Sequence, residues 1–210
     1  MENQTGRSMI EMLGVLAIVG ILSIGGISAF QKAMTKHKIN QTTEEFSQYI
    51  TEILRYSADF RKMHKNNTST QFVGIAGASE FFLPTKWIRK GSYLYDSMKN
   101  EIWPSIRNDL MGPTRKFLNL GYTLTYGKNK SDLCVALYNL SQSYTDSIYK
   151  VSVYHIKGDG GDFAYMAMGN IYCTSGKKCL KDITPTEMVN NCQLCMEDDK
   201  GCSFVFTFPL

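Results

Sequence analysis

The sequence is poor in the residues from which catalytic and nucleic-acid-binding sites are built. Its formal net charge is only +4 over 210 residues, so we infer no nucleic-acid partner. The three histidines (His37, His64 and His155) lie in different segments, and no serine stands in a nucleophile-elbow motif. We therefore predict that the chain has no catalytic residues, needs no cofactor and is not an enzyme.

Charge is also missing near the N-terminus. No ionisable side chain occurs from Met12 to Phe30, and these 19 residues would form a helix about 28 Å long. That length is close to the thickness of a hydrocarbon core, about 30 Å. The only polar side chains in the run, Ser23 and Ser28, can donate hydrogen bonds to carbonyls of the preceding turn. The run is therefore a candidate membrane span.

Glu11 lies at the start of this run and does not suit a plain membrane span. An unpaired carboxylate in a span costs about 2.5–3.5 kcal/mol on insertion scales, so we expect a partner that neutralises it. Gly6 stands five residues before Glu11. A glycine followed at the fifth position by glutamate, and then by an unbroken apolar helix, resembles the class III signal of type IV pilins and of the pseudopilins of type II secretion.

This resemblance implies a processing and assembly pathway. In that family a prepilin peptidase cuts after the glycine, which here places the cleavage between Gly6 and Arg7. The glutamate then pairs with the new N-terminal ammonium of a neighbouring subunit as the filament assembles, and Glu11 would have this role. Cleavage would create the free amine that an isolated intramembrane carboxylate needs.

The partners and the location of the chain follow from the same resemblance. The implied partners are prepilin peptidase, other copies of the chain or related pilins, and the assembly machinery of the inner membrane. The precursor would span the bacterial inner membrane once, with a periplasmic head, and would then enter a cell-surface pilus or a periplasmic pseudopilus. Two alternatives are an ordinary secretory signal cut near Ser23 to Ser28 and a plain anchor for a periplasmic binding domain or enzyme.

Helical periodicity continues after the apolar run. Large apolar residues recur there at steps of three and four: Phe46, Tyr49, Ile50, Ile53, Leu54, Tyr56, Phe60 and Met63. We predict one helix from Ser8 to Lys65, ended by Asn66-Asn67. Its first half would lie in the membrane, and its second half would pack on a soluble domain, which is the architecture that the pilin resemblance implies.

The chain is thereby divided into four segments, namely a leader peptide (1–6), the membrane-spanning half of the helix (7–30), its amphipathic half (31–65) and a globular head (66–210). The predicted fold is α+β. It would be a pilin-like roll, in which the long N-terminal helix packs on an antiparallel sheet.

The second half of the head gives the clearer secondary-structure signals. Alternation predicts strands at 122–126, 148–156, 165–172 and 203–208, the last of them an edge or hairpin strand. Residues 131–140 favour a short helix with Ser131 as its N-cap. Thr184-Pro-Thr-Glu187 is a capping box that opens a further helix through Cys192.

Residues 66–120 yield fewer predictions. Apolar residues before Pro84 suggest a short helix that this proline stops, and Pro104 and Gly112-Pro113 are interpreted as turns. No site can be assigned in this segment.

Cysteine is absent before position 134. The six cysteines are Cys134, Cys173, Cys179, Cys192, Cys195 and Cys202. An even set confined to one region of an exported chain indicates disulfides formed in an oxidising compartment. The alternative is a zinc site that uses Cys192-x-x-Cys195 with Cys173 and Cys179, but the spacing between Cys173 and Cys179 fits a ribbon-type site poorly.

The C-terminal region carries a second resemblance. A helix with a cysteine near its end, followed by a terminal strand, is similar to the ends of type IVb-like pilins. In those proteins that cysteine is bridged to one on the helix after an earlier strand. Cys134 and Cys192 match these two positions, so the resemblance implies a bridge between them.

The other four cysteines can then pair locally. Cys173 and Cys179 enclose a glycine-bearing turn, which leaves Cys195 with Cys202. Six cysteines allow 15 pairings, and Cys192 and Cys195 are close enough in sequence to exchange partners, so alternatives to this map stay open.

A calcium site is a further alternative, at Asp159 and Asp162 of Gly158-Asp-Gly-Gly-Asp162. Calcium takes 6 to 8 oxygen ligands, and two carboxylates with nearby carbonyls are too few. We interpret the segment as a turn and predict no metal.

Overall fold

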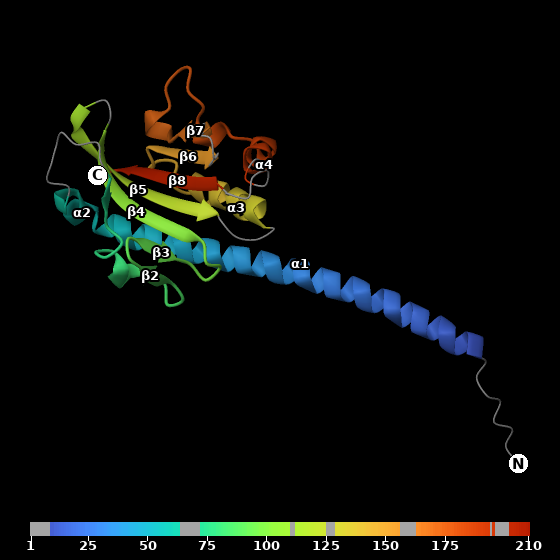
Figure 1. Ribbon diagram of the computed structural model, residues 1–210. Helices are drawn as coiled ribbons and strands as arrows, with labels where there is room; N and C mark the ends of the chain where they lie inside the picture. Colours follow the sequence, from blue (N-terminus) through green and yellow to red (C-terminus); the bar gives the residue numbers. More distant parts are fainter. Residues whose placement is uncertain are drawn as a thin grey trace, which may run out of the picture. The chain divides into compact units, whose positions relative to one another are not determined.

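The computed structural model describes residues 9–63, 72–109, 112–124, 129–155, 163–193, 195 and 202–210 (Figure 1). It contains a long N-terminal helix and an antiparallel sheet, so the predicted α+β class is confirmed. The chain divides into two compact units, Met1–Lys38 and Ile39–Leu210, and each is described by itself. The second unit contains the sheet and the hydrophobic core.

Helices and strands alternate irregularly along the chain. The helices are α1 (Met9–Arg55), α2 (Ser57–Met63), α3 (Lys130–Gln142) and α4 (Pro185–Gln193), with short 3-10 helices η1 (Glu80–Phe82), η2 (Asn170–Tyr172) and η3 (Leu180–Asp182). The strands are β1 (Val73–Gly74), β2 (Ile88–Lys90), β3 (Tyr93–Tyr95), β4 (Glu101–Asp109), β5 (Gly112–Leu124), β6 (Lys150–His155), β7 (Phe163–Met168) and β8 (Cys202–Pro209).

The N-terminal helix is shorter than predicted, because the single helix expected to reach Lys65 is broken at Tyr56. The Tyr56 amide donates to the carbonyl of Ile53, three residues back, at 3.2 Å, which tightens the last turn. The Tyr56 ring stacks on Phe82 at 4.7 Å, and Phe60 of α2 meets the same ring edge-on at 6.4 Å. The break therefore lets both aromatic side chains contact η1.

The sheet runs in the order β2-β3-β4-β5-β8-β6-β7, and β1 pairs with β4. Figure 1 shows β8 between β5 and β6, although it is the last strand of the chain. The prediction of an edge or hairpin strand at 203–208 was therefore wrong in position. Both neighbours pair with β8, and Cys202 to Phe208 are buried.

Two long strands, β4 and β5, occupy a segment for which turns were predicted. Pro104 lies inside β4 rather than in a turn, and Gly112 begins β5. The carbonyl of Pro104 accepts from the Ile75 amide, so its nitrogen points to the same side, away from β5. On that side the pairing of β4 with β3 ends at Ile102 and the pairing with β1 begins at Ser105, so no ladder bond is lost.

Other secondary-structure predictions hold, with changed ends. The expected helix at 131–140 is α3, but it begins at Lys130, so Ser131 lies inside it and is not its N-cap. Strand β6 lies within 148–156, and β7 ends at Met168, where η2 replaces the rest of the predicted strand. The short helix before Pro84 is η1.

The two faces of the sheet differ in chemistry. On β5 the residues Leu118, Leu120 and Tyr122 point to an inner face, which α1, α3 and α4 cover. Asn119 and Gly121 alternate with them on the outer face. The sheet is thus apolar toward the helices and largely polar on the other side.

Phe46 of α1 is the centre of the core. Its ring lies 5.0 Å from Tyr122 of β5, 5.3 Å from Phe206 of β8 and 6.2 Å from Trp87. Like Tyr49, Ile50 and Ile53 on the same face of α1, it is fully buried. The second half of the helix is therefore part of the head's core.

Three disulfides stabilise the C-terminal part of the chain. They join Cys134 to Cys192, Cys173 to Cys179, and Cys195 to Cys202, with Cα–Cα distances of 5.7, 5.5 and 5.1 Å. This is the pairing expected above. The first bridge links α3 to α4 across 58 positions, for which the chain-entropy estimate is a stabilisation of about 4 kcal/mol.

The capping box predicted at the start of α4 is confirmed. The Glu187 amide donates to Thr184 Oγ1 at 3.3 Å, and the Thr184 amide donates to Glu187 Oε2 at 2.8 Å. Lys178 Nζ donates to the other carboxylate oxygen at 2.6 Å. This last bond, with those from Thr184, lowers the pKa of Glu187 to about 2.

Replacing Phe46 by alanine is expected to lower the free energy of unfolding by about 3–5 kcal/mol, because it leaves a cavity among buried rings. Urea unfolding of the detergent-solubilised chain measures the loss. Phe81→Ala is the matched control: Phe81 is 93% exposed, so the same truncation should change stability by less than about 0.5 kcal/mol. Equal losses in the two variants would contradict the central position of Phe46.

The stability that Glu187 contributes should depend on pH. Its folded-state pKa lies below the ordinary value of 4.5, so the contribution is present above pH 4.5 and disappears as the pH falls toward 2. Urea unfolding of Glu187→Gln and the unchanged chain, near pH 6 and near pH 3, should show a difference that shrinks at the lower pH. An equal difference at both values would refute this assignment.

Candidate functional site: the N-terminal apolar helix

The first unit of the chain is described from residue 9 to residue 38, and all of this part belongs to α1. The helix continues through Gly14, Gly20 and Gly25-Gly26 without a break. Each glycine costs about 1 kcal/mol relative to alanine in a helix. In lipid, a single segment can satisfy its backbone N–H and C=O groups only by intrahelical hydrogen bonds. A membrane environment would therefore keep this segment helical despite its glycines. Ser23 donates to the carbonyl of Val19 at 2.7 Å, as predicted for a hydroxyl in a span.

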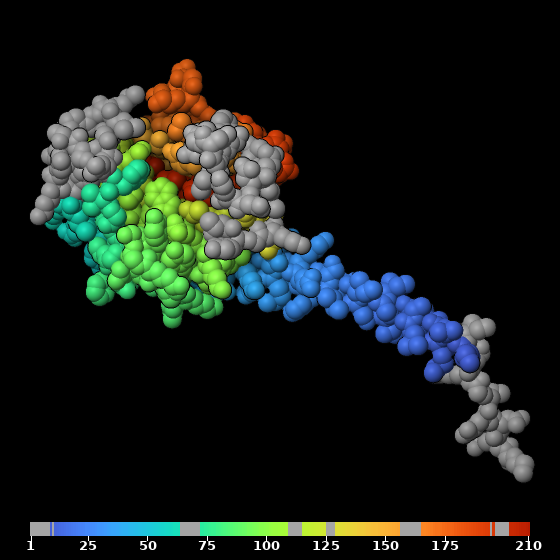
Figure 2. Space-filling view, in the orientation of Figure 1, coloured from blue at the N-terminus to red at the C-terminus, as the bar shows by residue number. Residues whose placement is uncertain are grey.

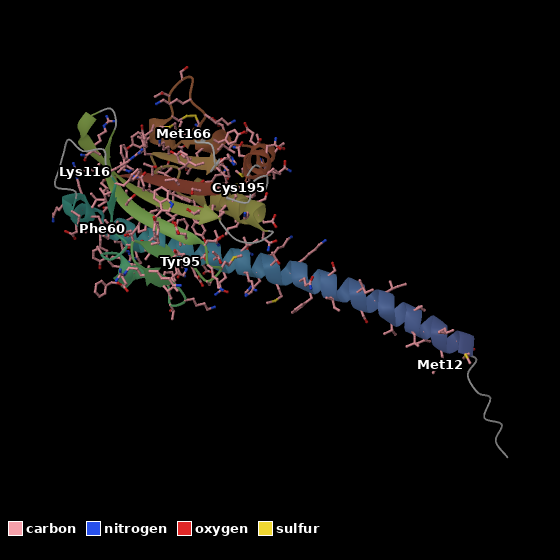
Figure 3. All side chains as sticks on the ribbon, viewed as in Figure 1. Met12, Phe60, Tyr95, Lys116, Met166 and Cys195 are labelled. Atoms are coloured by element: carbon pink, nitrogen blue, oxygen red, sulfur yellow. A yellow bond between two sulfur atoms is a disulfide. The ribbon has the colours of Figure 1, made fainter. Side chains whose placement is uncertain are left out.

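Apolar side chains cover this part of α1 and remain exposed. More than half of the side-chain surface is accessible at several large residues, among them Leu16, Ile21, Leu22, Ile24, Ile27 and Phe30. Figure 2 shows the N-terminal part of α1 in blue, and Figure 3 shows side chains projecting from the helix between Met12 and the sheet-containing unit. The helix is long and apolar enough to cross a membrane. A continuous apolar surface of this kind marks contact with lipid or with other proteins.

Glu11 lies in the first turn of α1 and is exposed. Within the part of the chain that the structure describes, no lysine, arginine or histidine forms an ion pair with it. A carboxylate in the first turn interacts favourably with the helix dipole, but that interaction is worth only about 0.3–1 kcal/mol. The helix dipole would therefore offset only a small part of the free-energy cost of placing the Glu11 carboxylate in lipid, and a counterion would be needed to offset the rest. Gly6 and Arg7, the predicted cleavage residues, lie outside the described residues.

The structure overturns the zinc alternative. All six cysteines are in disulfides, so none of the four proposed ligands is a thiolate. Among the described residues there is no group of three or more histidine, cysteine or acidic side chains that could hold a metal ion. Asp159 and Asp162, the alternative calcium ligands, lie outside the residues that the structure describes.

The histidines are not brought together. His37 is exposed on α1, whereas His155 is buried at the end of β6 with its ring 6.0 Å from that of Tyr165. His64 lies outside the described residues.

The sequence analysis missed a second feature, a pocket of about 310 Å³ on the outer face of the sheet. Trp103 and Arg107 of β4, Asn119 of β5 and Thr207 of β8 are among its lining residues. Alternation of these residues with Ile102, Ile106 and Leu118 is the signal that could have revealed it. Residues 66–120 were not recognised as strands, and β8 was expected at an edge, so the residues could not be placed together.

Comparisons of the chain with protein-family models, with curated proteins and with solved structures return no match. The apolar helix and Glu11, which has no counterion among the described residues, are thus the features from which a function can be inferred.

Proposed function

We propose that the chain is the structural subunit of a type IV pilus-like filament, made as a prepilin and assembled through its N-terminal helix. The observation that carries this proposal is Glu11. It is a carboxylate in the first turn of an uncharged helical run, five residues after Gly6, with no counterion among the described residues.

The charge of Glu11 supports assembly from several copies. No basic side chain lies between Met12 and Phe30, so the run itself offers no partner. Cleavage between Gly6 and Arg7 would supply an ammonium group, and the amine of a neighbouring copy would reach Glu11 only in the filament. Neutralising a carboxylate that costs about 2.5–3.5 kcal/mol in lipid would then favour assembly directly.

The exposed apolar surface of α1 supports the same role. Lipid would cover it in the precursor, and the helices of other subunits would cover it in the filament. Gly25, Ala29 and Ala33 stand at four-residue spacing, which allows helices to approach closely. Prepilin peptidase, further copies or related pilins, and inner-membrane assembly machinery are therefore the proposed partners.

The head has the features that such a subunit needs. The second half of α1 packs on the inner face of an antiparallel sheet, and we assign this arrangement to the pilin-like roll. Three disulfides suit an oxidising space, so the head would be periplasmic in the precursor and exposed on the filament afterwards.

The proposal predicts where the mature chain begins. Protein extracted from cells with active prepilin peptidase should start at Arg7 in N-terminal sequencing, and Gly6→Leu should prevent the cut, because the bulky side chain blocks the protease groove. Gly14→Leu, a matched change inside the span, should leave processing intact. A chain that still starts at Met1, or one cut near Ser23 to Ser28, would contradict the proposal.

Glu11→Ala should leave cleavage and the folding of the head intact but reduce assembled filaments at least tenfold, because the ion pair exists only between subunits. Immunoblots of the sheared filament fraction against the membrane fraction measure this. Glu11→Asp should restore part of the assembly. Glu44→Ala removes the same charge from an exposed position later in α1 and serves as the control. Normal filament yield in Glu11→Ala would favour a plain membrane anchor instead.

A further inference from the structure

The outer face of the sheet buries polar atoms that have no hydrogen-bond partner among the described residues. These atoms are Ser105 Oγ, Arg107 Nε, Asn119 Nδ2 and Ser152 Oγ. By strand register, all four side chains lie on the face opposite the helices. An unsatisfied buried polar atom costs about 1–3 kcal/mol, so a cluster of them on one face calls for an explanation.

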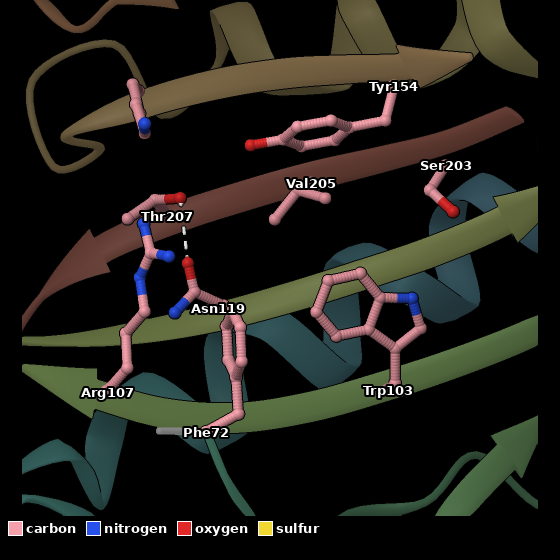
Figure 4. Close-up of a pocket in the computed structure, with 9 residues that line it drawn as sticks. Phe72, Trp103, Arg107, Asn119, Tyr154, Ser203, Val205 and Thr207 are labelled. Carbon is pink, nitrogen blue, oxygen red and sulfur yellow. Dashed lines mark hydrogen bonds between the residues drawn. The ribbon is translucent and has the colours of Figure 1, made fainter. Parts of the chain in front are cut away.

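The pocket of about 310 Å³ lies on this face (Figure 4). Its floor is formed by Asn119, Val205 and Thr207 of the central strands β5 and β8. Figure 4 shows Trp103 and Tyr154 on opposite sides of Val205, and Arg107 near Asn119. Among the described residues, the lining thus combines aromatic rings, an amide, hydroxyls, a guanidinium group and the ammonium group of Lys150, and it contains no aspartate or glutamate.

Trp103 is held as a flat platform. Its indole lies over Gly121, directly across the strand pair, where any larger side chain would overlap the ring. The indole nitrogen donates to Thr123 Oγ1 at 3.2 Å, which fixes the ring in its plane. The face of an aromatic ring carries negative charge, so it attracts the weakly positive C–H groups of a ring-shaped ligand.

Half of the Asn119 amide is buried on this face without a partner among the described residues. Its side chain is 98% buried, with 2% of its surface exposed, and Thr207 Oγ1 donates to Asn119 Oδ1 at 3.0 Å. The other half of the amide has no partner in the described part of the chain. That half is Nδ2, which donates, so an acceptor such as the oxygen of a ring hydroxyl is the kind of ligand group that completes this amide.

Arg107 supplies a positive charge, and Lys150 of β6 is a second cation in the lining. The guanidinium carbon of Arg107 lies 5.2 Å from the centre of the Phe72 ring, and Nε has no acceptor among the described residues. It forms no ion pair with a described carboxylate either. A planar guanidinium held by an aromatic ring binds a carboxylate with high geometric specificity.

From these groups we propose that the outer-face pocket binds a carboxylate-bearing sugar, one hexuronic acid residue at a time. Trp103 stacks on the C–H face of the sugar ring, Asn119 bonds a ring hydroxyl, and Arg107 binds the carboxylate. A volume of about 310 Å³ lies at the lower end of the range for ligand sites, which suits a single sugar ring. The site belongs to the head alone and does not depend on the filament role proposed above.

Two matched ligands test the proposal. Glucuronate and glucose differ only in the carboxylate, so calorimetric titration of the full chain should give at least tenfold tighter binding of glucuronate. The chain is kept in a detergent without a sugar headgroup, so that the detergent does not occupy the pocket. Inorganic phosphate, an anion without a ring, should compete only weakly.

Variants separate the three contacts. Arg107→Met keeps the aliphatic stem and should reduce glucuronate affinity at least tenfold while leaving glucose binding unchanged. Trp103→Ala should weaken both sugars, and Trp103→Phe, which keeps a ring, should restore part of the binding if the alanine variant fails to fold. Arg89→Met removes the same charge from β2, outside the pocket, and should change neither affinity.

Three results would overturn the proposal. Equal affinity for glucuronate and glucose would remove the role of Arg107, and phosphate that competes as well as glucuronate would show a general anion site without sugar recognition. Unchanged glucuronate affinity in both Arg107→Met and Trp103→Phe would place any binding elsewhere on the chain.

Discussion

The burial of one face of α1 against the sheet is the contact on which the rest of the head depends. Phe46 meets rings from β5 and β8, strands that are far apart in sequence, and Tyr49 donates a buried hydrogen bond to Ser79 at 2.8 Å. Burial raises the pKa of the Tyr49 hydroxyl far above its ordinary value, so the group stays a neutral donor. The helix therefore holds together strands that no short loop connects.

The parts of this core that could be predicted from sequence are those set by local periodicity. The helical stripe from Phe46 to Ile53 shows a step of three and four, and Thr184 with Glu187 forms a capping box whose geometry is entirely local. The position of β8 could not be predicted in this way. Alternation along Ser203 to Phe208 indicates a strand, but it does not show that β5 and β6 lie on either side. Strand order is a property of long-range pairing.

The same distinction separates the two candidate sites. Glu11 could be found from sequence because it stands at the start of a long uncharged run, and that contrast is visible within one segment. The pocket could not, because Trp103, Asn119 and Thr207 come from three strands that only the sheet topology makes neighbours. Pro104, at the centre of β4, also suggested a turn, although its nitrogen faces a gap between two partner strands.

The Glu11 carboxylate and the amide of Asn119 both lack a partner among the described residues, but different groups can satisfy them. An unpaired carboxylate in lipid costs about 2.5–3.5 kcal/mol, and an unsatisfied buried amide costs a comparable 1–3 kcal/mol. A water molecule can bond the amide of Asn119, because polar cavities in proteins readily hold ordered water. If α1 spans a membrane as proposed, the hydrocarbon core would hold no water to hydrate Glu11. In a membrane-spanning α1, a counterion would therefore reduce the cost of Glu11 in a way that water could not, whereas water alone can satisfy the amide in the outer-face pocket.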